Sequence, residues 1–96
     1  MKLVIVPPAI AELQHAAAFY TAKANIELGL AFVAEFEKTG NRIPEYPNLG
    51  AAFRGKLRRY LFRRFPYSII YQITPDELRI VAVAHHRRRP GYWLKR

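Results

Sequence analysis

The 96-residue chain contains no cysteine, and this absence excludes several kinds of chemistry at once. Without thiols there is no disulfide framework, no cysteine nucleophile and no cysteine metal site. Long apolar runs are also missing, because nothing approaches the roughly eighteen consecutive apolar residues of a membrane-spanning helix. The short apolar run after Lys2 is too brief for the core of a signal peptide. We therefore expect a soluble, cytoplasmic protein.

Acidic residues are nearly absent from the second half of the chain. Residues 51–96 hold twelve Lys/Arg, ten of them arginine, against two Asp/Glu, whereas residues 1–50 hold four Lys/Arg against five Asp/Glu. Arginine presents a planar fork of donors that suits phosphate and carboxylate and stacks on aromatic rings. Because these arginines are interspersed with Tyr, Phe and Trp, the pattern predicts binding to an anionic partner. The alternative is a solvated face whose arginine stems cover apolar surface.

Common catalytic and cofactor motifs are missing as well. The sequence has no GxGxxG, P-loop, HExxH or GxSxG. The pair His85-His86 is the nearest approach to a metal motif, but adjacent residues of a strand point to opposite faces. We therefore expect neither a cofactor nor a metal site.

The periodicity of apolar residues predicts a single α+β domain spanning residues 1–96. A strand over 2–6 is followed by helices over 9–24 and 26–40, which form an antiparallel hairpin because their connection is very short. A loop over 42–55 leads to strands over 56–65, 66–74 and 78–86. The predicted order is β-α-α-β-β-β, with the first strand and the helix hairpin packed on one face of a small, mainly antiparallel sheet. The other face is left to water or a partner, and the arginines line it.

Two apolar stripes give this prediction its detail. In the last strand Leu78, Ile80, Ala82 and Ala84 are expected to share one face. The stripe of the second helix has four members and is widened by three more. These residues are Ile26, Leu30, Val33 and Ala34, widened by Leu28, Phe32 and Phe36.

Two motifs in the second half carry a family resemblance. Phe65 to Tyr71 reads Phe-Pro-Tyr-x-Ile-x-Tyr, and His85 to Pro90 reads His-x-x-Arg-x-Pro. Together with the order of elements over essentially the whole chain, they resemble the RelE/ParE superfamily of toxins from type II toxin–antitoxin modules, which are often described as plasmid-stabilisation proteins.

The resemblance implies a toxin that is neutralised by a small, acidic, ParD-like antitoxin and that enters a heterotetramer with it. The antitoxin typically lays a largely helical segment across the toxin. RelE-like members cut messenger RNA on the ribosome, whereas ParE-like members act on DNA gyrase and lack the nuclease residues.

The residues present favour the ParE-like branch and a non-enzymatic toxin. Cleaving relatives usually carry a set of lysines and arginines on the central strands and often a catalytic carboxylate, but the lysines of the second half here are limited to Lys56 and Lys95. Its two acids, Asp76 and Glu77, lie in a predicted turn, where we expect them to be remote from the arginines.

Two alternatives stay open. One is a ribosome-dependent endoribonuclease using His85, His86, Arg87 and Tyr92, and the other is a non-enzymatic basic module that binds nucleic acid.

The residues expected to contact the target or the antitoxin are arginines and aromatics of the second half. They are Arg58, Arg63, Arg64, Arg87, Arg88, Arg89, Tyr92 and Trp93. Pro90-Gly91 is expected to turn the chain so that Tyr92 and Trp93 fold back. Trp93 then has a second interpretation, as a hydrophobic clasp that pins the tail to the domain.

Overall fold

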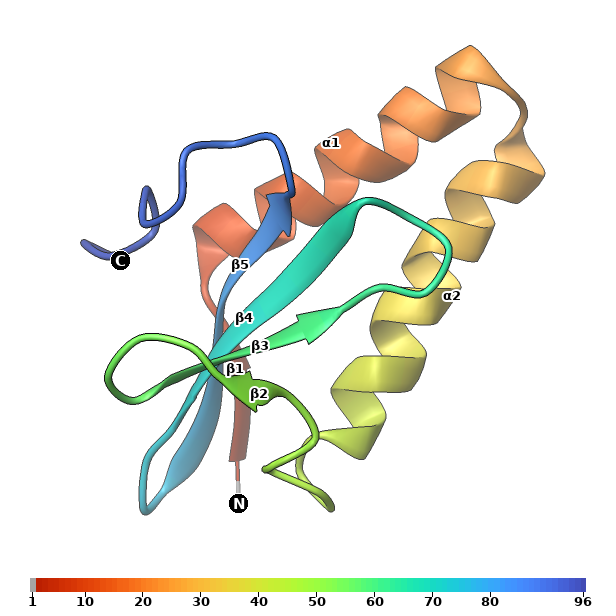
Figure 1. Ribbon diagram of the computed structural model, residues 1–96. Coiled ribbons are helices and arrows are strands. Elements are labelled where there is room, and N and C mark those ends of the chain that lie inside the picture. Colours follow the sequence, from red (N-terminus) through yellow and green to blue (C-terminus); the bar gives the residue numbers. More distant parts are fainter. Residues whose placement is uncertain (1) are drawn as a thin grey trace.

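The structure, a computed structural model, describes residues 2–96 and contains one five-stranded sheet and two helices (Figure 1). The elements are β1 (Lys2–Ile5), α1 (Pro7–Lys23), α2 (Ile26–Arg42), β2 (Ala51–Ala52), β3 (Leu57–Leu61), β4 (Tyr67–Ile73) and β5 (Glu77–His85). The predicted α+β order is confirmed. The short strand β2 is an addition, since these residues were predicted to lie in a loop.

The strands lie in the order β1-β5-β4-β3-β2. β1 runs parallel to β5, and all other neighbouring strands are antiparallel, as expected for a mainly antiparallel sheet. β1 pairs only with Glu77 to Ile80. The second half of β5 therefore has no strand neighbour on that side within the described chain, and its backbone groups need other partners.

Local sequence signals explain how the helices begin. Pro7 and Pro8 occupy the first turn of α1, where a missing N–H costs nothing. The side chain of Asn25 caps α2 by accepting a hydrogen bond from the Leu28 N–H at 2.8 Å. α2 continues through Gly40 to Arg42, two residues beyond the predicted end.

The stripe of α2 that faces the sheet differs from the predicted one. Ile26 and Leu30 are 59% and 60% exposed, whereas Phe32 and Phe36 are buried. The ring of Phe32 stacks on Phe62 with centroids 4.9 Å apart. One face of the helix is buried, and it is the face with the aromatic side chains, because these remove the most apolar area from water.

A β-bulge changes which residues of β5 share a face. Ile70 pairs with Ala82, but the next residue, Tyr71, pairs with Ile80, so Val81 is the extra residue. Leu78 and Ile80 share one face, as predicted, and this face packs against the helices. Beyond the bulge the alternation is reversed, so Ala82 and Ala84 lie on the opposite face and the prediction for them was wrong.

The face of the sheet away from the helices is not wholly open. The chain turns at Gly91, whose φ is +88°, and Trp93 returns to pack with Ile70, Ala82 and Ala84. Trp93 is only 5% exposed. The predicted fold-back of the tail is confirmed, and the prediction of a free face is corrected, because the chain covers part of this face itself. Neither helix in the described chain has the length and apolarity needed to cross a membrane.

Candidate functional site

One cationic surface lies where β4, β5 and the C-terminal tail meet residues 53–59. We call it the C-terminal pocket, and it has a volume of about 290 Å³. Its floor is apolar and its rim carries three arginines. The lining residues are Phe53, Arg54, Arg59, Ser68, Ile70, Ala84, His85, His86, Arg88, Pro90 and Trp93.

The arginines of this pocket rest on aromatic rings rather than on acids. Arg59 lies over the Phe53 ring at 4.8 Å, and Arg88 lies over the Tyr92 ring at 4.1 Å. Within residues 2–96 the only ion pairs are Arg79–Glu77 and Arg96–Glu12. No carboxylate of the described residues therefore compensates the charges of Arg59 and Arg88, and an anion bound in the pocket would gain charge-assisted hydrogen bonds from them.

The two histidines at the end of β5 have different surroundings. The Nε2 atom of His86 lies 2.9 Å from the Ser68 hydroxyl. The ring of His85 packs edge-on against Tyr67, and its Nδ1 accepts a hydrogen bond from the Arg87 N–H at 3.0 Å. Burial lowers the pKa of His85, and the positive charges of Arg87 and His86 lower this pKa further. Both effects favour the neutral form of the His85 imidazole.

A hydrogen-bonded latch fastens the tail to α1. Glu12 accepts hydrogen bonds from the Tyr92 hydroxyl, from the Val83 N–H at 3.0 Å and from Arg96 at 2.8 Å. Arg96 also donates to the Val81 carbonyl at 3.1 Å. These contacts supply partners for the half of β5 that β1 does not reach. No pattern in the sequence indicates this role for Glu12.

The latch also changes the chemistry of Tyr92. Burial raises the pKa of Tyr92 well above its ordinary value of 10.0, the hydrogen bond to Glu12 and the negative charge of that carboxylate raise it further, and Arg88 and Arg96 oppose the shift. A phenol held in its neutral form against a carboxylate is a poor proton donor to a substrate.

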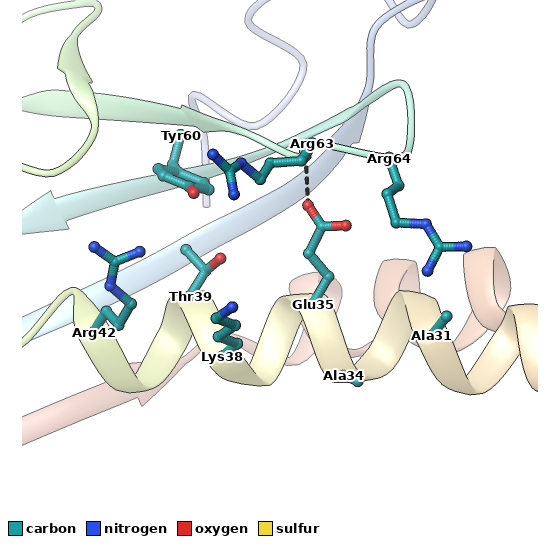
Figure 2. Close-up of a pocket in the computed structure, with 9 residues that line it drawn as sticks. All are labelled: Ala31, Ala34, Glu35, Lys38, Thr39, Arg42, Tyr60, Arg63 and Arg64. Carbon is teal, nitrogen blue, oxygen red and sulfur yellow. Dashed lines mark hydrogen bonds between the residues drawn. The ribbon is translucent and has the colours of Figure 1, made fainter.

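A second cationic surface lies between α2 and the segment that follows β3. We call it the α2 groove, and it has a volume of about 490 Å³ (Figure 2). It is lined by Ala31, Ala34, Glu35, Lys38, Thr39, Arg42, Tyr60, Arg63 and Arg64. The one carboxylate, Glu35, accepts a hydrogen bond from the Arg63 backbone N–H.

The structure divides the predicted contact residues between these surfaces. Arg88 and Trp93 line the C-terminal pocket, whereas Arg63 and Arg64 line the α2 groove. Arg87 and Arg89 are exposed and line neither surface.

Three predicted contact residues are held by intramolecular contacts. Arg58 donates to the Gly50 carbonyl at 2.6 Å, and Tyr92 belongs to the latch. Trp93 is buried, and its indole N–H has no hydrogen-bond partner in the described chain. Its position matches the clasp interpretation.

Several lining residues and one ion pair were not predicted from the sequence. Lys38 and Arg42 are four residues apart on one helix, so helical spacing could have found them. Arg54 and Arg59 reach the C-terminal pocket through tertiary packing, which no local pattern indicates. The prediction that the acids are remote from the arginines was wrong for Glu77, which lies 3.6 Å from Arg79.

Comparisons with known proteins agree with this architecture. Residues 3–90 match the family described as "ParE toxin of type II toxin-antitoxin system, parDE". A solved structure titled "Chromosomal ParDE TA system from P. aeruginosa" superposes with a TM-score of 0.78 and 20% sequence identity, covering 88% of this chain and 95% of that chain. A search of curated proteins found no match.

Proposed function

The chain belongs to the ParE toxins of type II toxin–antitoxin systems, and we propose that it acts by inhibiting DNA gyrase rather than by cutting RNA. It is the toxin component of its module, and an antitoxin is its partner. The observation that supports a binding mechanism is the C-terminal pocket, where Arg54, Arg59 and Arg88 have no acid partner in the described chain.

The groups that a ribonuclease would need are poorly placed. Cleavage at a 2′-hydroxyl requires a base and an acid within reach of one substrate. The Tyr92 hydroxyl donates its hydrogen bond to the Glu12 carboxylate and not to a substrate. His85 and His86 both line the C-terminal pocket, but one ring nitrogen of each is already engaged, because His85 Nδ1 accepts the Arg87 N–H and His86 Nε2 lies 2.9 Å from the Ser68 hydroxyl. Binding through guanidinium groups remains, and it needs no proton transfer.

A supercoiling assay with purified gyrase tests the target. We expect free toxin to abolish supercoiling, and we expect Arg59→Glu/Arg88→Glu to weaken inhibition by about tenfold or more, since charge reversal at a contact costs several kcal/mol. The matched control is Lys2→Glu/Lys23→Glu, which makes the same change in net charge at exposed positions outside the pocket. Normal supercoiling at saturating toxin would overturn the proposal.

A translating extract tests the ribonuclease alternative. We expect intact messenger RNA in the presence of toxin. Codon-position cleavage that is lost in His86→Ala would assign the chain to the RelE-like activity instead. Salt-sensitive DNA binding without growth arrest would indicate a basic nucleic-acid-binding module.

We take the antitoxin to be a small, acidic, ParD-like protein and the neutralised complex to be a heterotetramer. The molar mass of the co-purified complex, measured by light scattering, tests this assembly. A mass that fits one copy of each chain would contradict it.

A further inference from the structure

We propose that Glu12 of α1 is a positioning residue for the C-terminal pocket. Glu12 does not line this pocket. It acts through Tyr92, whose ring supports two residues that do line it, Arg88 and Trp93. The inference rests on the proposed function, because the binding that this pocket supports is measured as inhibition of gyrase.

The part of the tail that completes the pocket has few backbone ties to the rest of the domain. Residues 88–96 contain no helix or strand, and they supply Arg88, Pro90 and Trp93 to the pocket lining. Within the described chain, the backbone–backbone hydrogen bonds of these residues run only among themselves and to the His85 carbonyl at the end of β5. Side chains must therefore hold this part of the tail against the domain.

Glu12 provides two of these side-chain contacts. Its carboxylate accepts hydrogen bonds from the Tyr92 hydroxyl and from both terminal nitrogens of Arg96, at 2.8 and 3.2 Å. A two-nitrogen contact between a guanidinium and a carboxylate fixes direction as well as distance. The Glu12 side chain is 14% exposed, so water has little access to it. Glu12 thus joins the tail to α1 at two points, which restricts both sliding and rotation of the tail.

Tyr92 connects this anchor to the pocket. Its hydroxyl is bonded to Glu12, and the guanidinium carbon of Arg88 lies 4.1 Å from the centre of its ring. Trp93 meets the same ring edge-on, with centroids 5.0 Å apart. Arg88 forms no ion pair in the described chain, so the cation–π contact with this ring is what supports it. A rotation of the Tyr92 side chain would therefore displace a cation of the rim and part of the apolar floor together.

A purely structural role for Glu12 is the alternative, because Glu12 also accepts the Val83 N–H at 3.0 Å and so satisfies the edge of β5. The two roles have different consequences. If Glu12 only stabilises the fold, every substitution with an equal loss of stability affects inhibition equally. If Glu12 positions the pocket, its loss weakens inhibition more than a stability-matched substitution does, and the effect depends on Tyr92.

Inhibition of supercoiling by purified full-length variants tests the positioning role. Glu12→Gln can keep an oxygen on the Val83 N–H, but its amide nitrogen cannot accept from Tyr92 or Arg96. We expect it to raise the half-inhibitory concentration about tenfold, since affinity falls with the fraction of molecules whose pocket is assembled. Tyr92→Phe keeps the ring but removes the hydroxyl, and we expect about threefold. The double variant should match Glu12→Gln alone, because Glu12 acts through Tyr92.

Two controls separate positioning from stability and from charge. Tyr71→Phe removes the bonds to Gly50 and Pro47, outside the pocket, and should lower stability comparably while inhibiting as the wild type does. Glu77→Gln makes the same change in net charge as Glu12→Gln and should also inhibit normally. Normal inhibition by Glu12→Gln, or an equal loss of inhibition in Tyr71→Phe, would overturn the proposal.

The fluorescence of Trp93 reports on the pocket without reference to gyrase, because it is the only tryptophan in the sequence. We expect Glu12→Gln to shift the emission to longer wavelength and to increase quenching by acrylamide, since the indole gains access to water. Far-UV circular dichroism should stay unchanged, and both control variants should keep the wild-type emission. If Glu12→Gln does not fold, Tyr92→Phe should show the same shift in smaller degree.

The two measurements separate this inference from the proposed target. If no variant inhibits gyrase while the emission spectra differ as expected, the target is wrong and the positioning role stands. If the wild type inhibits gyrase and Glu12→Gln inhibits it equally, the positioning role is wrong and the target stands. Unchanged Trp93 emission in Glu12→Gln and in Tyr92→Phe would contradict the positioning role whatever the target.

Discussion

Arg96 at the end of the described chain forms an ion pair with Glu12 in α1, with 2.8 Å between Nη1 and Oε1. The same carboxylate accepts the Val83 N–H, and the same guanidinium donates to the Val81 carbonyl. Two side chains thus satisfy the edge of β5 beyond the end of β1. The pair links the first helix, the last strand and the tail, so we expect it to matter more than its partly exposed position suggests.

Replacing Glu12 is therefore expected to destabilise the protein. Glu12→Gln leaves Arg96 without its charge partner, and we expect a loss of about 1–3 kcal/mol in the free energy of unfolding. Urea unfolding followed by circular dichroism measures it. The matched control is Glu77→Gln, which removes the more exposed Arg79–Glu77 pair and should cost less than about 1 kcal/mol. Equal effects of the two changes would contradict the role of the latch.

The latch also predicts alkaline destabilisation. Because the pKa of Tyr92 is raised in the folded protein, the unfolded chain loses this proton first as the pH rises above about 10. Stability should therefore fall with increasing pH in that range, and less steeply in Tyr92→Phe. Unfolding midpoints between pH 9 and 11, about one unit on either side of that value, measure the difference. The same slope in both proteins would show that Tyr92 does not contribute.

His85 gives a prediction at mildly acidic pH. Its pKa lies below the ordinary 6.5, mainly because of burial and then because of the charges of Arg87 and His86. The unfolded chain thus takes up a proton before the folded protein does, so this contribution to stability is lost as the pH falls below 6.5. An NMR titration of the imidazole should give a midpoint below 6.5 that rises in Arg87→Gln. A midpoint at or above 6.5 would disprove the shift.

Two glycines should respond in opposite directions to alanine. A Cβ at Gly50 would lie 2.8 Å from Tyr71 Cε1 and 3.0 Å from the Arg59 carbonyl carbon, so Gly50→Ala should cost about 1–3 kcal/mol. A Cβ at Gly40 meets nothing within 4 Å, and this glycine lies inside α2. Gly40→Ala should therefore stabilise by up to about 1 kcal/mol. Thermal unfolding of both variants checks the contrast, and a change of the same sign in both would refute it.

The buried hydroxyl of Tyr71 explains why Gly50 matters. It accepts the Gly50 N–H and donates to the Pro47 carbonyl, both at 2.8 Å. Tyr71→Phe removes both bonds and leaves a buried N–H unpaired, so we expect a loss of about 2 kcal/mol. Hydrogen exchange at Gly50 should accelerate in this variant, whereas Tyr46→Phe, an exposed tyrosine of the same loop, should change neither quantity. Unchanged exchange at Gly50 would contradict the tie between loop and sheet.

Sequence patterns predicted the elements well because each has a local cause. Pro7-Pro8 and Asn25 mark the helix starts, and alternation marks the long strands. The faces were predicted less well. Ile26 and Leu30 fit a helical stripe as well as Phe32 and Phe36 do, and only packing against Phe62 and Phe65 decides which stripe is buried.

By itself the sequence determined the order of elements, the family resemblance and the concentration of arginine in the second half, since these depend on residue type and spacing. Tertiary structure alone decided that the bulge at Val81 reverses the faces of β5, that Glu12 holds the tail, and that the cations divide between two surfaces. The physical reason is that these outcomes depend on contacts between residues up to 84 positions apart. Such contacts leave no periodic trace in the chain.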